Sequence, residues 1–327
     1  MNVGFHTNQI GERGTEVAIY DYALANINKF GNKSIIFSPY NAVKNIKVLE
    51  KFQGKFIVYL YENIEDFYER TRELKIDLCY YIKSGENDGL LSPYCKNVVH
   101  AVFNRSEPHG DRYAYISRWL SIKASKDEKN YVPHIISIKN YNKSIRNKYD
   151  PDVSKKIFGC YGGKDSFNIW YAVAIVILLA NLNNKFLFFF MNTRLKPKSR
   201  SLKFLLKRAL RRKTIILFKT EVGDEAKSRF INACDVMLHA RKAGESFGIA
   251  IGEFSIHGKP IITCNNVLIK DRCHLEILKN EGNYYCGPLT FLMKIFKVKS
   301  KYKVSNVYQL EYNVDTVMER FQRIFLS

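Results

Sequence analysis

The segment "DVMLHARKAGESFGIAIGEFSIHGKPIIT", residues 235–263, determines which fold we expect for this chain. Its first residues are apolar enough for a buried strand, residues 241–246 form a turn, and a helix can run from Phe247. We expect the helix to end before Gly258, because glycine favours the left-handed cap conformation and Pro260 cannot continue a helix. A second apolar strand follows. The segment therefore predicts a βαβ unit.

Two carboxylates lie close to the start of this helix. Glu253, in the second turn, can point back toward Glu245 in the preceding loop, because helical side chains lean toward the N-terminus. The backbone N–H groups of residues 246–248 would attract an anion, and Gly248 and Gly252 would let a ligand or a backbone come close. This combination suits a ligand with both hydroxyls and phosphate. The alternative is that Glu245 interacts with the helix dipole and that Glu253 is solvated or ion-paired.

The rest of the chain alternates strand-like and helical runs. Strands are expected at 2–7, 34–38, 55–61, 77–83, 96–103, 112–117, 156–163, 185–192, 213–220 and 235–240, with helices at 14–30, 42–52, 64–75, 166–182, 201–210 and 224–234. Such alternation is typical of parallel sheets built from βαβ units. The polar stretch 140–156 resembles a linker.

We therefore expect an α/β protein with two Rossmann-like domains whose parallel sheets face each other across a cleft. The predicted domains are residues 1–145 and 154–305, and residues 306–327 contain a last helix that can pack back on the first domain. Ligands in open α/β folds bind at the carboxyl ends of the strands.

The composition favours an anionic partner. The chain of 327 residues has 52 Lys and Arg against 31 Asp and Glu, a net charge of +21, which suits nucleic acid, an acidic membrane or phosphate ligands. The seven cysteines are odd in number and form no CxxC pair, which argues against disulfides or a zinc site and for the cytoplasm. No signal-peptide pattern is present at the N-terminus. The apolar run 169–180 is shorter than the roughly 20 residues of a membrane span and predicts a buried helix.

A strongly basic segment, residues 195–214, combines cations with a helical stripe of leucines. It can be an outer helix with a solvated basic face, or it can dock on anionic lipid or an anionic acceptor glycan. Nucleic acid is the least favoured partner, since no zinc, RNP or helix-turn-helix pattern is present.

Residues 235–263 resemble the signature of retaining GT-B glycosyltransferases of the family 4 type. That signature is E-x-F-G, a second glutamate with seven residues between the two, then G-x-P and an apolar strand. Its positions are occupied here by Glu245, Phe247, Gly248, Glu253, Gly258 and Pro260. The resemblance implies the GT-B fold and transfer of a sugar from a nucleotide diphosphate donor with retention at the anomeric carbon, without a metal or other cofactor.

The resemblance also implies roles for single residues. Glu245 would contact the hydroxyls of the donor sugar, and Glu253 those of the ribose. Ser246, Phe247 and Gly248 would meet sugar or phosphate through their backbone amides. His100, at the end of the strand-like "NVVH", would reach the donor sugar at the reaction centre.

Further site residues follow from the same resemblance. Gly163 and Lys164 fall in a glycine-rich turn that grips the diphosphate in the family. The usual arginine just before this lysine is absent, and Arg194, after the next strand, is a candidate replacement. Gly11 and Gly14 fit the glycine-rich loop after the first strand, which faces donor and acceptor.

His109 and Asp111, in "SEPHGDRY", are acceptor-side candidates. The D-x-D at Asp150 and Asp152 is typical of metal-dependent GT-A enzymes, but Pro151 interrupts it and it lies in the predicted linker. We therefore expect no metal site there.

The predicted function is transfer of a hexose, with GDP-mannose expected as donor from the resemblance, to a glycan, glycolipid or glycoprotein. A nucleotide-sugar epimerase of double-Rossmann plan and a non-enzymatic, basic nucleic-acid-binding α/β protein remain as alternatives. We expect a cytoplasmic protein, with residues 195–214 as a peripheral membrane contact. The abundance of Lys, Asn, Ile and Tyr is typical of an AT-rich genome, such as that of a large DNA virus or a bacterium.

Overall fold

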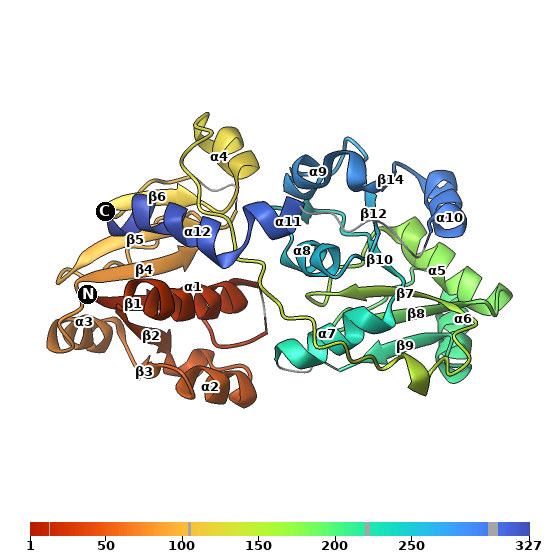
Figure 1. Ribbon diagram of the computed structural model, residues 1–327, viewed down its shortest axis with the longest axis horizontal. Coiled ribbons are helices and arrows are strands. Elements are labelled where there is room, and N and C mark those ends of the chain that lie inside the picture. The colour runs from red at the N-terminus through yellow and green to blue at the C-terminus, as the bar shows by residue number, and fades with distance from the viewer. Residues whose placement is uncertain (13, 104–105, 220–222, 300–306) are drawn as a thin grey trace. The chain divides into compact units, whose positions relative to one another are not determined.

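The computed structural model describes residues 1–12, 14–103, 106–219, 223–299 and 307–327. The chain forms two compact units (Figure 1). Unit 1 comprises Met1–Ile135 and Leu310–Ser327, and unit 2 comprises Ile136–Gln309. The division therefore falls before the predicted linker, which lies inside unit 2. Residue 220 of the predicted strand 213–220 and residues 300–306 around the predicted boundary at 305 lie outside the described residues.

Unit 1 is built on a six-stranded sheet in the order β3-β2-β1-β4-β5-β6, in which every pairing is parallel. The strands are β1 Asn2–His6, β2 Lys33–Pro39, β3 Ile57–Tyr61, β4 Leu78–Lys83, β5 Lys96–Ala101 and β6 Arg112–Tyr115. The helices are α1 Gly14–Phe30, α2 Ile46–Gln53, α3 Ile64–Glu73 and α4 Arg118–Ser125, with α12 Val314–Phe321 from the end of the chain. Helix α4 was not predicted.

Helix α1 has the predicted limits, whereas α2 begins four residues later than predicted. Residues 40–42 form a separate 3-10 turn, and the side chain of Asn45 accepts a hydrogen bond from the N–H of Lys47. Asparagine at this position caps a helix because it satisfies a backbone donor of the first turn. The apolar pattern begins before Asn45, so the predicted helix was too long at its N-terminal end.

Unit 2 is built on a second parallel sheet of six strands, in the order β14-β12-β10-β7-β8-β9. Its strands are β7 Lys156–Tyr161, β8 Phe186–Met191, β9 Ile215–Phe218, β10 Val236–His239, β12 Ile261–Cys264 and β14 Asn283–Tyr285. A separate pair joins β11 Gly244–Glu245 and β13 Asp271–Arg272. The helices are α5 Trp170–Leu182, α6 Arg200–Arg211, α7 Asp224–Ala233, α8 Ile249–Ile256, α9 Cys273–Leu278 and α10 Pro288–Lys297. The next helix along the chain, α11 Val307–Glu311, contains the division, with Gln309 in unit 2 and Leu310 in unit 1. The two parallel sheets confirm the predicted α/β class.

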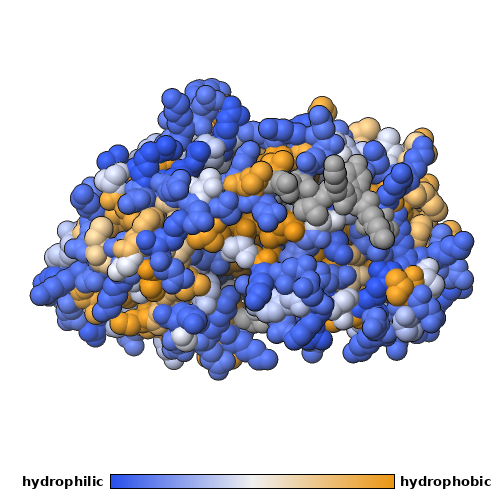
Figure 2. Space-filling view, in the orientation of Figure 1, coloured by the Kyte–Doolittle hydropathy of each residue, from blue (hydrophilic) through white to orange (hydrophobic). Residues whose placement is uncertain are grey.

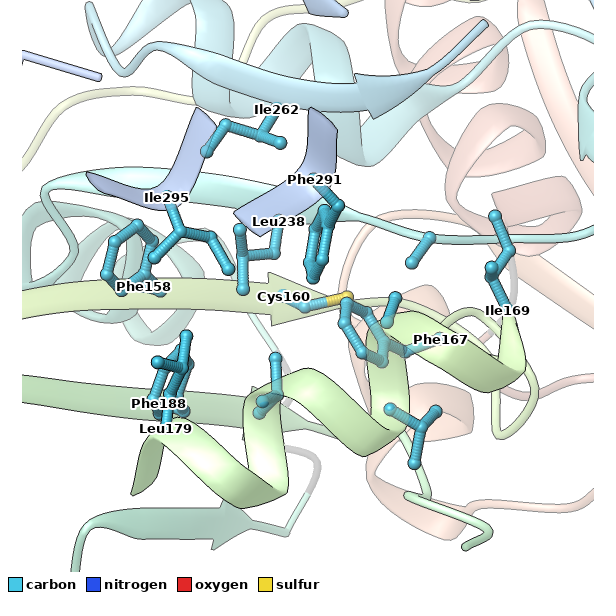
Figure 3. Close-up of a cluster of buried hydrophobic side chains, with 14 of the residues drawn as sticks. Phe158, Cys160, Phe167, Ile169, Leu179, Phe188, Leu238, Ile262, Phe291 and Ile295 are labelled. Carbon is cyan, nitrogen blue, oxygen red and sulfur yellow. The ribbon is translucent and has the colours of Figure 1, made fainter. Parts of the chain in front are cut away.

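Both faces of the second sheet are covered, which explains why its central strands are apolar without alternation. One face packs against α5, α6 and α10, and Figure 3 shows Phe158 of the sheet beside Ile295 of α10, and Phe188 beside Leu179 of α5. On the other face, Phe254 of α8 lies beside a strand glycine, Gly159. Helix α10 was not predicted.

Helix α5 is less buried than the sequence predicts. The apolar run 169–180 was predicted to be a buried helix, but Trp170, Leu178 and Leu182 are exposed. Within the described ranges, no helix is long and apolar enough to cross a membrane. All seven cysteines are free, as predicted from their number and spacing.

Candidate functional site

The predicted donor residues of unit 2 follow three neighbouring strands at the carboxyl edge of its sheet. The chain builds β8 and β9 outward from β7, and then β12 and β14 outward from β10 on the opposite side. The order therefore reverses between β7 and β10, and such a switch point is where open α/β sheets bind ligands. The loop after β7 contains Gly163 and Lys164, and the loop after β10 leads to Glu245.

Glu245 is held by two donors from the loop and strand before it. Its Oε1 lies 3.1 Å from Nε2 of His239, and its Oε2 accepts a hydrogen bond of 2.7 Å from Arg241. Burial alone would raise the pKa of Glu245, but the hydrogen bond from His239 and the charge of Arg241 lower it below its ordinary value. The carboxylate is therefore charged at neutral pH and has a fixed orientation.

The contact between His239 and Glu245 also assigns the proton on the imidazole ring. A carboxylate only accepts hydrogen bonds, so Nε2 of His239 carries the proton. Nδ1 of the same ring lies 2.8 Å from the hydroxyl of Thr263, at the end of β12, and a hydroxyl can donate to it. The ends of β10 and β12 thus position Glu245 together.

The backbone around Glu245 depends on two glycines in left-handed conformations. Gly244 has φ 74°, and a Cβ there would lie 1.9 Å from the carbonyl oxygen of Asp271, so only glycine allows β11 to pair with β13. Gly248 has φ 97° and forms the N-cap of α8. Helix α8 therefore begins at Ile249, two residues later than predicted, because residue 248 is not helical.

The end of α8 agrees with the prediction. Gly258 has φ +68°, its N–H donates to the carbonyl of Ser255, and the N–H of Lys259 donates to the carbonyl of Phe254. These two bonds form a Schellman motif, which satisfies the last carbonyl groups of a helix.

Glu253 is buried on α8 and forms an ion pair with Lys227 of α7 at 2.8 Å. The ion pair is the alternative that the sequence left open for this glutamate. A Cβ at Gly252 would lie 2.9 Å from both Ile136 and Tyr308, so this glycine accommodates packing side chains and not a ligand, contrary to our expectation.

Lys164 and Arg194 are neighbours at the carboxyl edge. The backbone N–H of Arg194 donates to the carbonyl of Lys164 over 3.0 Å, and both side chains are exposed. The loops after β7 and β8 therefore bring together the two cations that the sequence proposed as a diphosphate grip. At Gly162, just before Gly163, a Cβ would lie 2.4 Å from the hydroxyl of Ser166, so this turn also requires glycine.

Gly11 and Gly14 lie in unit 1, after the carboxyl end of β1. Gly11 is buried and Gly14 is the exposed first residue of α1. The loop is tied to the segment after β2, because Ile10 exchanges backbone hydrogen bonds with Ala42 and Lys44. Both glycines are thus at the carboxyl edge of their own sheet, and their contact with a ligand stays a prediction.

His100 lies in the core of unit 1. Its Nδ1 is 2.6 Å from the hydroxyl of Tyr80, its ring packs against Tyr22 and Phe325, and its side chain is fully buried. Burial lowers the pKa of His100 to about 3. This placement weighs against the predicted contact with a donor sugar.

His109 and Asp111 are found at the opposite, amino edge of the first sheet. The carboxylate of Asp111 accepts from the N–H of Asn97, at the start of β5, over 2.6 Å. His109 precedes β6 and contacts the carbonyl of Glu107. Ligands in parallel sheets bind at the carboxyl edge, so this position weighs against an acceptor role.

Asp150 has a structural role. Its buried carboxylate accepts hydrogen bonds from the guanidinium of Arg146 and from the N–H groups of Ser154 and Lys155. Asp152 is exposed nearby. The carboxylate of Asp150 is therefore already used in closing a turn.

The residues that hold the two glutamates were not predicted. Lys227 was seen only as part of a helix, and His239 and Thr263 only as ends of strands. The polar side chains that end apolar strands were the available signal for the last two. His274 of α9 packs edge-on against His239 at 4.9 Å, and burial, followed by the nearby His239 and Arg272, holds its pKa well below the ordinary value.

Comparison with known proteins adds information on the fold. No protein-family model matches the chain, and no curated protein matches its sequence. Among solved structures, HepE from Anabaena in complex with UDP and glucose is similar over 100% of both chains, with a TM-score of 0.73 and 14% identity. A glycosyltransferase from Rickettsia africae matches 99% of this chain and 97% of its own, with a TM-score of 0.64 and 14% identity. TarM matches 100% of this chain and 99% of its own, with a TM-score of 0.69 and 10% identity.

These similarities extend over essentially the whole chain, so they cover both sheets. Together with the two six-stranded parallel sheets, they show that the chain has the GT-B fold of two Rossmann-like domains.

Proposed function

We propose that this chain is a glycosyltransferase that moves a hexose from a nucleoside diphosphate sugar to an acceptor. The observation that supports this most is the arrangement at the carboxyl edge of the second sheet. There the charged carboxylate of Glu245 follows β10, and the exposed cations Lys164 and Arg194 follow β7 and β8. A carboxylate accepts hydrogen bonds from sugar hydroxyls, and cations neutralise a diphosphate.

The proposed reaction keeps the configuration of the anomeric carbon, as the sequence resemblance implies. The bond between that carbon and the diphosphate oxygen breaks, and the acceptor oxygen bonds to the carbon from the same face. The leaving phosphate takes the proton of the acceptor hydroxyl. Glu245 would orient the sugar through its hydroxyls, while Lys164 and Arg194 would stabilise the charge of the leaving diphosphate.

The nucleotide and the sugar of the donor are a separate, more specific proposal. The resemblance favours GDP-mannose, whereas HepE was crystallised with UDP-glucose. Both donors therefore belong in the first test. The acceptor is proposed to be a glycan, glycolipid or glycoprotein, and a cytoplasmic location suits the free thiols.

We propose that no metal takes part. The turn at Gly162 and Gly163, the loop before α8 and the two cations offer backbone donors and positive charge to a diphosphate. Transfer should then persist after chelation with EDTA and should not need added Mn²⁺. Loss of turnover in EDTA with recovery on Mn²⁺ would contradict this part of the proposal alone.

The test of the function is calorimetric titration with UDP, GDP, UDP-glucose, GDP-mannose and duplex DNA. We expect saturable binding of one nucleotide sugar, weakened by Glu245→Gln. A matched control is Glu50→Gln, an exposed glutamate of α2, which should bind like the unmodified chain. Binding of DNA but of no nucleotide would favour the nucleic-acid alternative. An epimerised sugar nucleotide, formed without an acceptor, would favour the epimerase.

A further inference from the structure

Three helices of unit 2 form one continuous layer. Inward side chains of α5, α6 and α10 belong to the same buried cluster as Phe158, Phe188 and Ile262 of the sheet. Helix α5 contacts α6 on one side and α10 on the other. Figure 1 shows α5, α6 and α10 beside the sheet of this unit. We call their outward surface the three-helix face.

Helix α5 contributes apolar side chains to this face. Trp170 is 60% exposed and Leu182 is 82% exposed, with Leu178 between them. Leu178 and Leu182 are four residues apart and so lie on one side of the helix. A helix that is apolar all round is normally buried, yet this one keeps an apolar side in contact with solvent.

Helices α6 and α10 extend the apolar surface. Leu289, Met293 and Phe296 of α10 are exposed and follow each other at helical spacing. Phe204 of α6 is 61% exposed. Figure 2 shows apolar atoms at the surface in the region of α10, among hydrophilic ones. Contiguous exposed apolar surface with a polar rim is typical of an interaction site.

The charge on the same face has a single sign. Helices Trp170–Leu182, Arg200–Arg211 and Pro288–Lys297 contain no aspartate or glutamate. Helix α6 carries five exposed cations, Arg200, Lys203, Lys207, Arg208 and Arg211. Among the described residues, none of these five makes an ion pair with a carboxylate.

We infer that the three-helix face is a docking surface for an anionic lipid bilayer. Cations of α6 and α10 would meet the lipid phosphates, and the exposed apolar side chains of α5, α6 and α10 would enter the boundary between headgroups and acyl chains. This inference does not depend on the proposed sugar transfer. The proposed surface extends beyond the basic segment 195–214, because α5 and α10 contribute most of its apolar side chains.

The charge pattern favours lipid over other partners. A second copy of the chain would bring a face of the same sign, and like charges at an interface repel. Nucleic acid would use the cations, but large aliphatic side chains such as Leu182 and Leu289 have no partner on a phosphate backbone. A bilayer provides phosphate and hydrocarbon at adjacent depths.

The first test is sedimentation with vesicles at physiological ionic strength. One set consists of phosphatidylcholine, and in the other part of it is replaced by phosphatidylglycerol. The chain should bind only the second set. The triple variant Lys203→Glu, Lys207→Glu, Arg211→Glu should weaken binding by about 100-fold or more, since each cation near an anionic surface contributes separately.

A matched control changes the net charge by the same amount in unit 1. Lys33, Lys47 and Lys55 are exposed, and their replacement by glutamate should leave vesicle binding within a fewfold of the original. Equal losses in the two triple variants would mean that net charge and not this face drives binding, and would overturn the inference.

The apolar part is tested by Leu182→Ser with Leu289→Ser, which should weaken binding to anionic vesicles by about tenfold. The control is Ile46→Ser with Leu310→Ser, two exposed apolar side chains of unit 1. Failure of the unmodified chain to bind anionic vesicles would overturn the inference. So would light scattering that shows dimers dispersed by Leu182→Ser with Leu289→Ser, because the face would then belong to a second copy.

Discussion

At the scale of single residues, the role of Glu253 depends on the neighbour with which it forms an ion pair. The sequence places it where a ribose could be held, and the structure pairs it with Lys227 in a largely buried environment. Removing one partner of a buried ion pair leaves the other charge uncompensated. A substitution at Glu253 therefore acts on folding as well as on any ligand.

For Glu253→Gln we expect two separable losses. Donor affinity should fall by about 10- to 150-fold if the carboxylate binds ribose hydroxyls, because a charge-assisted hydrogen bond contributes roughly 1.5 to 3 kcal/mol. The free energy of unfolding should also fall by about 1 to 3 kcal/mol because Lys227 loses its charged partner. Calorimetry and urea unfolding measure the two.

Combining Glu253→Gln with Lys227→Met separates these effects. The second change removes the cation that Glu253 neutralises, so stability should recover while affinity stays low. If donor affinity returned together with stability, Glu253 would have only a structural role.

Lys164→Ala and Arg194→Ala should each weaken the binding of a nucleoside diphosphate by about tenfold, and should hardly change that of the nucleoside, since their proposed partner is the diphosphate. The comparison is made by titration with both ligands. Lys196→Ala is a matched control, because Lys196 is an exposed neighbour already paired with Asp165 at 2.6 Å. Similar losses for diphosphate and nucleoside would remove the two cations from this role.

At the scale of elements, the short strand β11 determines where Glu245 points. Gly244 and Gly89 have nearly the same φ, 74° and 73°, but a Cβ at Gly89 meets no heavy atom within 4 Å. Gly89→Ala should cost about 1 to 2 kcal/mol from backbone strain alone. Gly244→Ala adds the overlap with Asp271 and should cost about 3 kcal/mol or more, with loss of donor binding. Urea unfolding of the two variants, side by side, checks this difference, and equal costs would show that β11 adapts.

Local signals account for the elements that the sequence predicted well. The end of α8 followed from Gly258 and Pro260, and the limits of α1 from its apolar spacing. The start of α8 was misplaced because nothing local reveals that Gly248 is left-handed. Helix α10 was missed although Pro288 is typical of a first helical position.

The contacts that could not be predicted join segments that are distant in the sequence. Lys227 reaches Glu253 from another helix, and His239 and Thr263 meet only because β10 and β12 are adjacent in the sheet. His100 ends an apolar strand and so looked accessible. Phe325, from the last residues of the chain, covers it, and no pattern around residue 100 encodes that contact.

At the scale of the molecule, the buried histidines of unit 1 predict a loss of stability in mild acid. Burial lowers the pKa of His6, His100 and His134 to about 3, with Lys83 adding to the shift at His6 and His100 to that at His134. Between that value and the ordinary pKa of about 6.5, only the unfolded chain binds these protons. Stability is therefore full above pH 6.5 and falls as the pH decreases. Each histidine contributes up to about 1.4 kcal/mol per pH unit, so urea unfolding at pH 7.5 and 5.5 should differ clearly, and identical values would contradict the burial of these rings.

We expect the C-terminal segment to be as necessary for the stability of unit 1 as any of its strands. Phe321 of α12 is fully buried, and its ring lies 5.3 Å from that of Tyr22 and 5.4 Å from that of Tyr80. Phe321→Ala should lower the free energy of unfolding by about 3 to 5 kcal/mol, because it leaves a cavity in the core.

Hydrogen exchange in the Phe321→Ala variant should accelerate in residues 1–135 and not in 136–309. Phe254→Ala, an equally buried ring of unit 2, should give the reverse pattern, since each substitution opens only the unit whose core contains it. If Phe321→Ala accelerated exchange in both units equally, the two would unfold together, and the chain would be one cooperative body.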